Sequence, residues 1–432
     1  MLYKYKKMNS ALLVSSCFVT LMSFLMIINH SKIYFMTKRT IVAMPGDGIG
    51  KNVLKESVRV LDAVGFEANY IHADIGWEFW CKEGNPLPDR TLKLLEEHKI
   101  GLFGAITSKP KDKAEAELAP ELKGKGYIYY SPIVAMRQKY DLDICMRPCK
   151  TFKGNTLNFI RRGPNNTIEE PEIDTMIFRQ NTEGLYGGVE WTNPPDQVYD
   201  ALMTHKKFKE NFAWCPRPEL AVSTRILTKK YTTRIIKAAF EYAKTKGLKT
   251  VTVCEKPNVI RETSGMMLRI AQEMSKNEYP DIKVQDTNID AQMMWLTKNP
   301  ETYNVIVASN MFGDIISDGF AGLVGGLGFA CSANIGPEVA VFEPTHGSAP
   351  KYAEFNPSIV NPIAMILSAC MMLEHIGENE KARRIYNAVA AVVLEGKVKT
   401  YDMMKLSGNP DVFSKGAATM EQMTGAIIAK LK

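Results

Sequence analysis

The sequence predicts an α/β protein in which helices and strands alternate along the chain. Short β-like runs at residues 68–73 and 102–106 are separated from helical patterns such as residues 57–64. This alternation favours a sheet that is covered by helices. The composition agrees, because 45% of the 432 residues are hydrophobic and 23% are charged, which is ordinary for a folded chain of two or three domains.

The first strand-like run begins at Ile41 and leads into a glycine turn, Gly46-Asp-Gly-Ile-Gly50, with a helix expected from Asn52. A dinucleotide-binding Rossmann turn needs glycine at its first, third and sixth positions. The sixth position here is Lys51. The sequence therefore argues against a Rossmann fold.

Further along the chain, residues 109–126 are charged and rich in Lys, Glu and Pro, and we expect an exposed loop there. Apolar residues recur at helical spacing over residues 234–244, which predicts a helix. Strands are predicted for residues 251–254 and 305–308.

The stretch after the last of these strands, residues 310–328, carries the strongest chemical pattern. Asp314 and Asp318 are four residues apart, so in a helix both carboxylates leave from one face. Two like charges this close repel unless a cation lies between them. Mg²⁺ prefers oxygen ligands and commonly takes one or two carboxylates plus substrate oxygens. The alternative is two solvated aspartates near a helix start, where the helix dipole favours them.

Two further motifs follow, Glu343-Pro-Thr-His-Gly-Ser-Ala-Pro-Lys-Tyr352 and Asn361-Pro362. Together with residues 310–328 they resemble the signature of the β-decarboxylating dehydrogenases, the family of isocitrate, isopropylmalate, homoisocitrate and tartrate dehydrogenases. The resemblance runs from about Ile41 to the C-terminus and includes several separate motifs.

The resemblance implies the isocitrate/isopropylmalate dehydrogenase fold, with two α/β domains and no Rossmann fold. It also implies a homodimer in which two subunits share their active sites. The predicted parts are a large cofactor-binding domain at residues 36–142 and 325–432, a small substrate and dimer domain at 143–183 and 229–324, and a dimer clasp at 184–228.

Three arginines, Arg137, Arg147 and Arg179, stand where this family binds its malate-like substrate. Arginine presents a planar fork that binds carboxylates bidentately, although any one of the three taken alone is more typical of a surface ion pair. Ser131 stands where isocitrate enzymes contact the third carboxylate.

The resemblance also implies the catalytic and metal-binding residues. Tyr186 would protonate the enolate, although a tyrosine taken alone is as typical of a strand edge. Lys256 of the other subunit would act as the general base. Asp314, Asp318 and Asp290 of the other subunit would hold Mg²⁺ or Mn²⁺.

For the cofactor, the resemblance favours NADP, with NAD possible. Lys351 and Tyr352 stand where NAD-using relatives have Asp and Ile, and Tyr401 lies where NADP enzymes place a second phosphate-binding tyrosine. The implied cofactor-binding residues are Thr107, Asn258, His346, Gly347, Lys351, Tyr352, Asn361, Tyr401 and Asp402.

Isocitrate is the expected substrate, which would make the protein an NADP-dependent isocitrate dehydrogenase of the tricarboxylic acid cycle. However, Ile133 replaces an asparagine that is usual in isocitrate enzymes, and Phe103 replaces a lysine that is common there. Residues 104–108 and 131–133 also resemble homoisocitrate dehydrogenases of methanogenic archaea. The alternatives are a homoisocitrate or 3-isopropylmalate dehydrogenase, an NAD-dependent isocitrate dehydrogenase, or a catalytically silent regulatory subunit.

The first 35 residues differ from the rest, because a lysine-rich head precedes an apolar run at residues 11–28. This pattern is typical of a signal peptide or a short anchor. Translation could also begin at Met36. We expect an over-extended start or a dispensable targeting segment, and a cytoplasmic enzyme without a working membrane anchor.

Charge and cysteine content exclude two other classes. The net charge of +7 comes from scattered basic residues, which argues against nucleic-acid binding and suits an anionic substrate and cofactor. The eight cysteines are accompanied by no nearby histidine pair, so a zinc site is not expected. Reduced thiols in a reducing compartment are the simpler interpretation.

Overall fold

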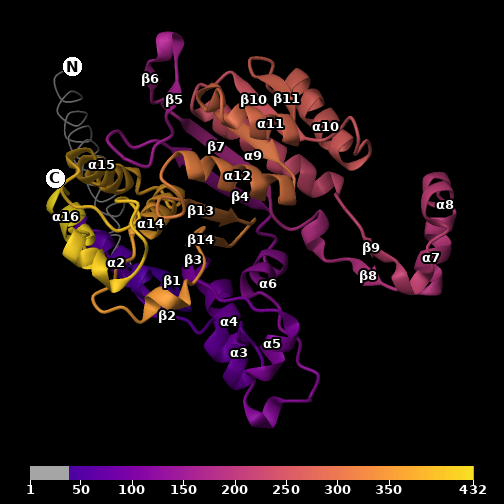
Figure 1. The fold of residues 1–432 in the computed structure, drawn as a ribbon, viewed down its shortest axis with the longest axis horizontal. Helices are drawn as coiled ribbons and strands as arrows, with labels where there is room; N and C mark the ends of the chain where they lie inside the picture. Colours follow the sequence, from indigo (N-terminus) through magenta and orange to yellow (C-terminus); the bar gives the residue numbers. More distant parts are fainter. Residues whose placement is uncertain (1–37, 432) are drawn as a thin grey trace, which may run out of the picture. The chain divides into compact units, whose positions relative to one another are not determined.

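A mixed sheet of ten strands forms the centre of the fold (Figure 1). The computed structural model describes residues 38–431, and one compact unit begins at Thr40. From edge to edge the strands are ordered β11-β10-β12-β7-β4-β13-β14-β3-β1-β2. Their bounds are β1 Arg39–Gly46, β2 Ala68–His72, β3 Ile100–Ala105, β4 Ile144–Lys150, β7 Asp174–Gln180, β10 Thr250–Glu255, β11 Lys283–Asn288, β12 Val305–Ala308, β13 Cys331–Ile335 and β14 Ala340–Pro344. The predicted α/β class is confirmed.

Helices cover both faces of this sheet. Outside the arm described below, the helices are α2 Gly50–Ala63, α3 Trp77–Glu83, α4 Asp89–His98, α5 Lys111–Ala116, α6 Pro132–Lys139, α9 Lys229–Thr245, α10 Thr263–Glu278, α11 Ile289–Leu296, α12 Asn310–Leu323, α13 Pro350–Ala353, α14 Ile363–His375, α15 Asn379–Glu395 and α16 Met420–Ala429. Short 3₁₀ turns are η1 Pro120–Leu122, η2 Pro164–Asn166, η3 Leu185–Gly187, η4 Arg217–Glu219, η5 Pro300–Thr302 and η6 Pro410–Lys415.

Buried residues on the central strands alternate between the two faces, as the two-residue period of a strand requires. Ile177 and Ile306 pack on one face in an apolar cluster with Phe312 of α12. Met176 and Val305 belong to a second cluster that includes the buried residues of α9. The first cluster fixes α12 against one face of the sheet, and this helix carries Asp314 and Asp318.

Two parallel sections of the sheet flank an antiparallel centre. β1, β3 and β14 run parallel, as do β7, β12, β10 and β11. Between them, β4 pairs antiparallel with β7 and β13, and β13 with β14. Ala308 of β12 lies in register with Arg179 of β7. Because α12 begins two residues after β12 ends, its first turn lies beside Arg179.

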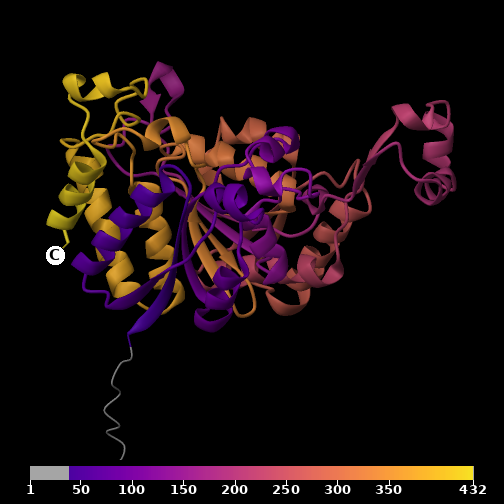
Figure 2. The ribbon, with the colours of Figure 1, turned by 90° about the horizontal axis from the view of Figure 1, so that it is seen from below.

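A separate arm, residues 190–223, extends away from the sheet (Figures 1 and 2). Two antiparallel strands form its stalk, and two helices lie between them in the chain. The elements are β8 Glu190–Thr192, α7 Asp196–Met203, α8 Lys206–Phe212 and β9 Ala221–Ser223. The arm falls inside the predicted clasp of residues 184–228, whose role between subunits stays a prediction.

Residues 109–126 contain α5 and η1, so the predicted loop is wrong over those residues, although most of the segment is exposed as predicted. In α5 and just after it, Ala114 and Leu118 are 1% and 3% exposed and pack against Trp80. The Trp80 indole N–H also donates to the Ala114 carbonyl at 2.8 Å. The charged residues occupy the outer side of this segment and conceal its two buried apolar positions.

The glycine turn after β1 is covered by protein, and the helix after it begins at Gly50, two residues before the prediction. Gly48 has φ +53°, and a Cβ atom there would lie 2.2 Å from the Ser348 carbonyl oxygen. The Ile49 N–H donates to that oxygen at 2.9 Å. The turn therefore packs against the loop after β14, in agreement with the absence of a Rossmann fold.

The predicted domain boundaries stay a prediction, because one sheet runs through both predicted domains. The predictions for residues 1–35 and for Met36 lie outside the described residues. Between residues 38 and 431, no helix has both the length and the apolar character to cross a membrane.

Candidate active site

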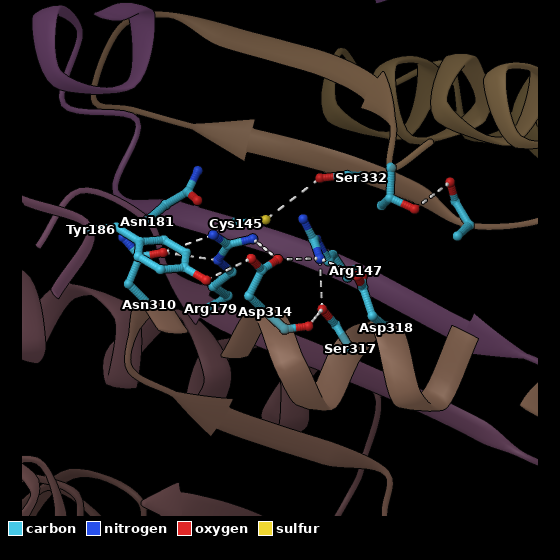
Figure 3. Close-up of polar contacts among 12 residues, drawn as sticks. Cys145, Arg147, Arg179, Asn181, Tyr186, Asn310, Asp314, Ser317, Asp318 and Ser332 are labelled. Carbon is cyan, nitrogen blue, oxygen red and sulfur yellow. Dashed lines mark hydrogen bonds and ion pairs between the residues drawn. The ribbon is translucent and has the colours of Figure 1, made fainter. Parts of the chain in front are cut away.

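The first two turns of α12 form one wall of the site, and the two predicted metal-binding aspartates lie on it (Figure 3). The predicted spacing is confirmed as helical, and both carboxylates reach the same atom. Arg147 Nη1 lies 3.0 Å from Asp314 Oδ1 and 3.1 Å from Asp318 Oδ1. It also donates to the Ser317 hydroxyl at 2.7 Å.

The second arginine, Arg179, reaches the same helix from β7. Its Nη1 pairs with Asp314 Oδ1, while its Nε and Nη2 donate to Asn310 Oδ1 at 3.0 and 2.9 Å. Asn310 lies four residues before Asp314, on the same helix face, and the sequence analysis did not single it out. The i, i+4 spacing alone could have identified it.

Burial and neighbouring charges shift the pKa values of the charged side chains in this wall. Burial, together with the neighbouring cations Arg147 and Arg137, lowers the pKa of Arg179 to about 10, so the guanidinium remains charged at neutral pH. Burial raises the pKa of Asp318, and Asp314 raises it further, while Arg147 opposes both effects. A further cation near the two carboxylates would favour their charged forms.

Tyr186 lies in η3, beside this wall, with its ring 5.7 Å from the Arg179 guanidinium. Its hydroxyl donates to Asp314 Oδ2 at 3.3 Å. Burial and then the negative charge of Asp314 raise the pKa of Tyr186, although the Arg179 cation opposes this effect. The phenol is therefore protonated at neutral pH and can serve as a proton donor.

The third arginine, Arg137, lies on α6 and belongs to a buried polar chain. Its Nη2 donates to Glu343 Oε1 at 3.0 Å. The amide of Asn334 donates to the same oxygen at 2.8 Å, and the amide of Asn181 donates to Asn334 Oδ1 at 2.7 Å. Ser131, the residue before α6, lies on the same segment as Arg137.

The buried nitrogen Nε has no hydrogen-bond partner in either Arg137 or Arg147 among the described residues. A buried donor without a partner is costly. Both arginines therefore keep one donor beyond the hydrogen bonds and ion pairs described above.

Lys256 and Asp290 form an ion pair with each other, and neither residue lies on α12. Lys256 follows β10, and Asp290 lies in the first turn of α11. Neither makes a hydrogen bond or ion pair with Asp314 or Asp318 among the described residues. The hydrogen bond from Lys256 lowers the pKa of Asp290.

Most of the predicted cofactor residues gather in a second cluster near the start of α13 and α14. The Tyr352 and Tyr401 rings lie 5.7 Å apart, and Lys351 Nζ lies 4.6 Å from the Tyr352 ring. The Asn361 amide donates to Asp402 Oδ2 at 3.0 Å. Lys351 itself is exposed.

The loop after β14 joins this cluster to the strand-end residue Thr107. The Thr107 and Ser348 hydroxyls are 2.6 Å apart. His346 Nδ1 lies 3.0 Å from the carbonyl of Gly347, and its buried Nε2 has no hydrogen-bond partner among the described residues. Asn258 follows β10 beside Lys256, so β12, β7, β4 and β13 separate its strand from β14.

The donor sets fit a divalent cation and a nucleotide differently. Between residues 38 and 431, no three His, Cys, Asp or Glu side chains come together as a metal site. Asp314 and Asp318 nevertheless converge, and two carboxylates with substrate oxygens suffice for Mg²⁺. The cluster around Lys351 offers a cation, two phenols and an amide, which suit a phosphorylated nucleotide.

Comparison with known proteins relates the chain to one enzyme family. The family model described as isocitrate/isopropylmalate dehydrogenase matches residues 40–427. Protein DlpA of Legionella pneumophila is 38% identical over 388 residues, which cover 90% of this chain and 58% of DlpA. The chain therefore spans less than two thirds of that relative.

Two archaeal relatives are matched over most of their length. Homoisocitrate dehydrogenase of Methanocaldococcus jannaschii is 38% identical, with 83% of this chain and 91% of the relative covered. 3-Isopropylmalate dehydrogenase of Methanothermobacter thermautotrophicus is 35% identical, with 84% of this chain and 93% of the relative covered. The crystal structure of isocitrate dehydrogenase from Methylococcus capsulatus superposes with a TM-score of 0.73 at 34% identity, covering 91% of this chain and 99% of that one.

Proposed function

The chain belongs to the isocitrate/isopropylmalate dehydrogenase family, and on this premise we propose that it oxidatively decarboxylates isocitrate to 2-oxoglutarate and CO₂ with NADP. The observation that carries the proposal is the convergence of Arg147 and Arg179 on the carboxylate of Asp314. Arginine forks of this kind match the carboxylates of a di- or tricarboxylate substrate.

The two residues that depart from the isocitrate pattern lie in the apolar core. Ile133 and Phe103 are both buried in a single apolar cluster, together with Leu142 and Met136. Ile133 lies on α6 and Phe103 on β3, and the two residues are 9% and 1% exposed. Ser131 precedes this helix and is partly exposed, so its hydroxyl is available to a third carboxylate.

Homoisocitrate is the second candidate substrate. The 38% identity to the Methanocaldococcus jannaschii homoisocitrate dehydrogenase favours it, and its three carboxylates suit the same arginines. It differs from isocitrate by one methylene group, a difference worth only about 1–3 kcal/mol in a binding pocket.

In the proposed reaction the arginines hold the substrate carboxylates, and two other side chains move protons. Lys256 of the second subunit takes the proton of the C2 hydroxyl as hydride leaves C2. After CO₂ leaves the β-keto acid, Tyr186 protonates the enolate carbon, for which its raised pKa keeps it in the acid form.

Asp314 and Asp318, with Asp290 of the second subunit, would hold Mg²⁺ or Mn²⁺. When bound, the cation would supply positive charge beside the substrate oxygen, and a nicotinamide nucleotide would supply the hydride acceptor. The residues around Tyr352 and Tyr401 would hold the nucleotide.

The proposal is tested by its products. With isocitrate, NADP, purified protein and Mg²⁺, equal amounts of NADPH, CO₂ and 2-oxoglutarate are expected. Formation of NADPH without CO₂, or no turnover with any of the three family substrates, would contradict it.

NADP is expected to be preferred over NAD by around 30-fold in kcat/KM. A unit charge pair at about 4 Å is worth roughly 4 kcal/mol at an effective dielectric constant near 20, before desolvation is subtracted. Half of that value corresponds to about 30-fold. The double variant Lys351→Asp/Tyr352→Ile is expected to lose most of the preference, because the carboxylate repels a 2′-phosphate and accepts from ribose hydroxyls.

Steady-state kcat/KM with each nucleotide decides this prediction. Lys276→Asp serves as the matched control, because it reverses an exposed lysine in the last turn of α10, which packs on β10 and β11, and it should leave the ratio unchanged. A wild-type protein that prefers NAD would show that Lys351 does not select the nucleotide.

We further propose a homodimer whose sites are shared. Exposed apolar residues on the helices beside the aspartates support a partner surface there, because such side chains are usually covered in an assembly. Met294 and Trp295 of α11 and Ile315 of α12 are each exposed. Asp290 lies in the first turn of the same helix, four residues before Met294, and this supports a role for it at such a surface.

Mixing a Lys256→Ala protein with a Tyr186→Phe protein is expected to restore activity. In a twofold dimer, random exchange makes half of the molecules hybrids with one intact site each, so roughly a quarter of the wild-type activity should return. The measurement is the rate after subunit exchange, compared with each variant alone.

The matched control is a mixture of Lys256→Ala with Asp290→Asn. Both defects lie in residues that one chain donates to the other, so every hybrid site is defective and no rescue is expected. Equal rescue in both mixtures would contradict the shared site.

A further inference from the structure

Arg225 lies where the return strand of the arm, β9, meets the body of the protein. Its guanidinium makes four hydrogen bonds to three different elements. Nη1 donates to the hydroxyls of Thr263 and Ser264 at 3.0 and 2.9 Å. Nη2 donates to Glu255 Oε2 at 2.8 Å and to the Ser309 hydroxyl at 2.7 Å. One side chain thus joins the arm to the end of β10, the start of α10 and the residue before α12.

The ion pair between Arg225 and Glu255 is largely buried, and neighbouring groups donate hydrogen bonds to Glu255. The two side chains are 12% and 1% exposed. Glu255 Oε1 accepts the backbone N–H of Ser309 at 2.8 Å, and Ser264 donates to Oε2 at 2.5 Å. The guanidinium also lies 5.1 Å from the ring of Phe312 on α12. Removal of one partner would leave a charge buried without compensation.

Two branches lead from this ion pair to the proposed active site. Glu255 is followed directly by Lys256, whose N–H lies 3.4 Å from the Ser264 hydroxyl. Ser309 is followed directly by Asn310, which accepts two hydrogen bonds from Arg179. The first branch therefore leads to the general base, and the second to the arginine and aspartates of α12.

The base of the arm is tied to the same region. The Gly184 N–H donates to the Ile226 carbonyl at 2.8 Å, which pairs the outgoing and returning chain segments. The Asn310 amide donates to the Glu183 carbonyl at 2.9 Å. Tyr186 lies two residues beyond Gly184, on the outgoing segment.

We propose that Arg225 is a positioning residue through which the placement of the arm sets both Lys256 and the first turn of α12. Contact of the arm with a second copy of this chain would then be coupled to catalysis by the ion pair with Glu255. This inference rests on the proposed function, because it assumes that Lys256 serves the site of the second subunit.

Arg225→Lys keeps the charge but cannot make all four hydrogen bonds. We expect kcat/KM for isocitrate to fall about 10- to 100-fold, the range that a misplacement of about 1 Å can cause. Glu255→Gln keeps the shape and removes the charge, and a loss in the same range is expected. The thermal unfolding midpoint and the dimer fraction are measured for both variants.

The matched control is Arg217→Lys. Arg217 is also an arginine of the arm, with an ion pair to Asp196 and a hydrogen bond to the Pro194 carbonyl at 2.7 Å, but these partners all lie at the arm. Its kcat/KM should stay within about threefold of the wild type, as is usual for a surface ion pair. An equal loss in Arg217→Lys and Arg225→Lys would overturn the proposal, because it would reflect general loosening of the arm.

Hybrid dimers separate the two branches. In the mixture of Lys256→Ala and Tyr186→Phe chains, the intact site combines α12 of the first chain with Lys256 of the second. Arg225→Lys placed only in the first chain should raise KM, because it disturbs Arg179 and Asp314. Placed only in the second chain, it should lower kcat, because it displaces Lys256.

Every outcome of the hybrid-dimer experiment supports or contradicts the proposal. The opposite assignment, or identical effects from both chains, would overturn the proposed branches. Failure of the unmodified mixture to regain activity would instead refute the shared site. In that case, an Arg225→Lys homodimer with unchanged activity overturns the role of Arg225, and one with lowered kcat but normal unfolding supports it.

Discussion

Chelation of divalent cations is expected to abolish turnover, and Asp314→Asn is expected to weaken the apparent affinity for Mg²⁺ by about 10²- to 10³-fold. The carboxylates of Asp314 and Asp318 both lie within 3.1 Å of Arg147 Nη1, so they converge on one small volume. A unit charge at about 4 Å contributes roughly 4 kcal/mol at an effective dielectric constant near 20, or about a thousandfold.

The measurement is the rate as a function of Mg²⁺ and Mn²⁺ concentration after removal of metal. Asp174→Asn is the matched control, because Asp174 lies on β7, the strand of Arg179, and pairs instead with Lys150 at 2.8 Å. This variant should keep the wild-type metal dependence. Full activity in excess chelator would remove the cation from the mechanism.

Asp314→Asn should also change binding of the cation in the absence of turnover. Calorimetric titration with Mn²⁺ and substrate is expected to show weaker binding to Asp314→Asn than to the wild type. If the two bind Mn²⁺ equally while only the rate falls, Asp314 acts through Arg147 and Arg179 and is not a ligand.

Local sequence patterns predicted the individual helices and strands of this site better than they predicted how these elements come together. The four-residue spacing of Asp314 and Asp318 indicated a helix with both carboxylates on one face, and α12 confirms it. Asn310 obeys the same spacing, yet its role as the acceptor for Arg179 depends on β7 lying beside β12. That neighbour relation joins strands that are far apart in the chain, and no local pattern encodes it.

The buried chain from Arg137 to Asn181 shows the same limit. Asn181 and Asn334 are 153 residues apart and meet in the antiparallel centre of the sheet, where β13 pairs with β4. Polar residues in strands otherwise resemble solvent-facing positions, so their burial could not be read from composition. The predicted loop at residues 109–126 failed for the converse reason, since Ala114 and Leu118 are buried within a charged segment.

The roles of the single residues stay predictions, and the position of Lys256 shows why. Within one chain it pairs with Asp290 and is not linked to Asp314 by a hydrogen bond or ion pair among the described residues. Its proposed function depends on a second copy of the chain, for which the subunit-mixing experiment is the decisive measurement.

Isopropylmalate is expected to be a very poor substrate, with kcat/KM lower than that of isocitrate by roughly 10⁴ or more. A site built to hydrogen-bond a polar group rejects an analogue that lacks it by factors of this size, because the polar groups of the site are left without partners. Ser131 and the Arg137 guanidinium would be such groups, and both lie on or just before α6. An isopropyl group can accept no hydrogen bond from either.

Steady-state kcat/KM for isocitrate, homoisocitrate and isopropylmalate, each with both nucleotides, tests this expectation. Ser131→Ala should lower kcat/KM for isocitrate and leave kcat/KM for isopropylmalate nearly unchanged. The ratio between the two substrates should therefore fall. Ser414→Ala is the control, because its hydroxyl donates to the Asp411 carbonyl within η6 and should not affect the ratio. A higher value for homoisocitrate than for isocitrate would reassign the substrate within the tricarboxylates. A higher value for isopropylmalate would instead mean that the pocket around Ser131 and Arg137 does not select a third carboxylate at all.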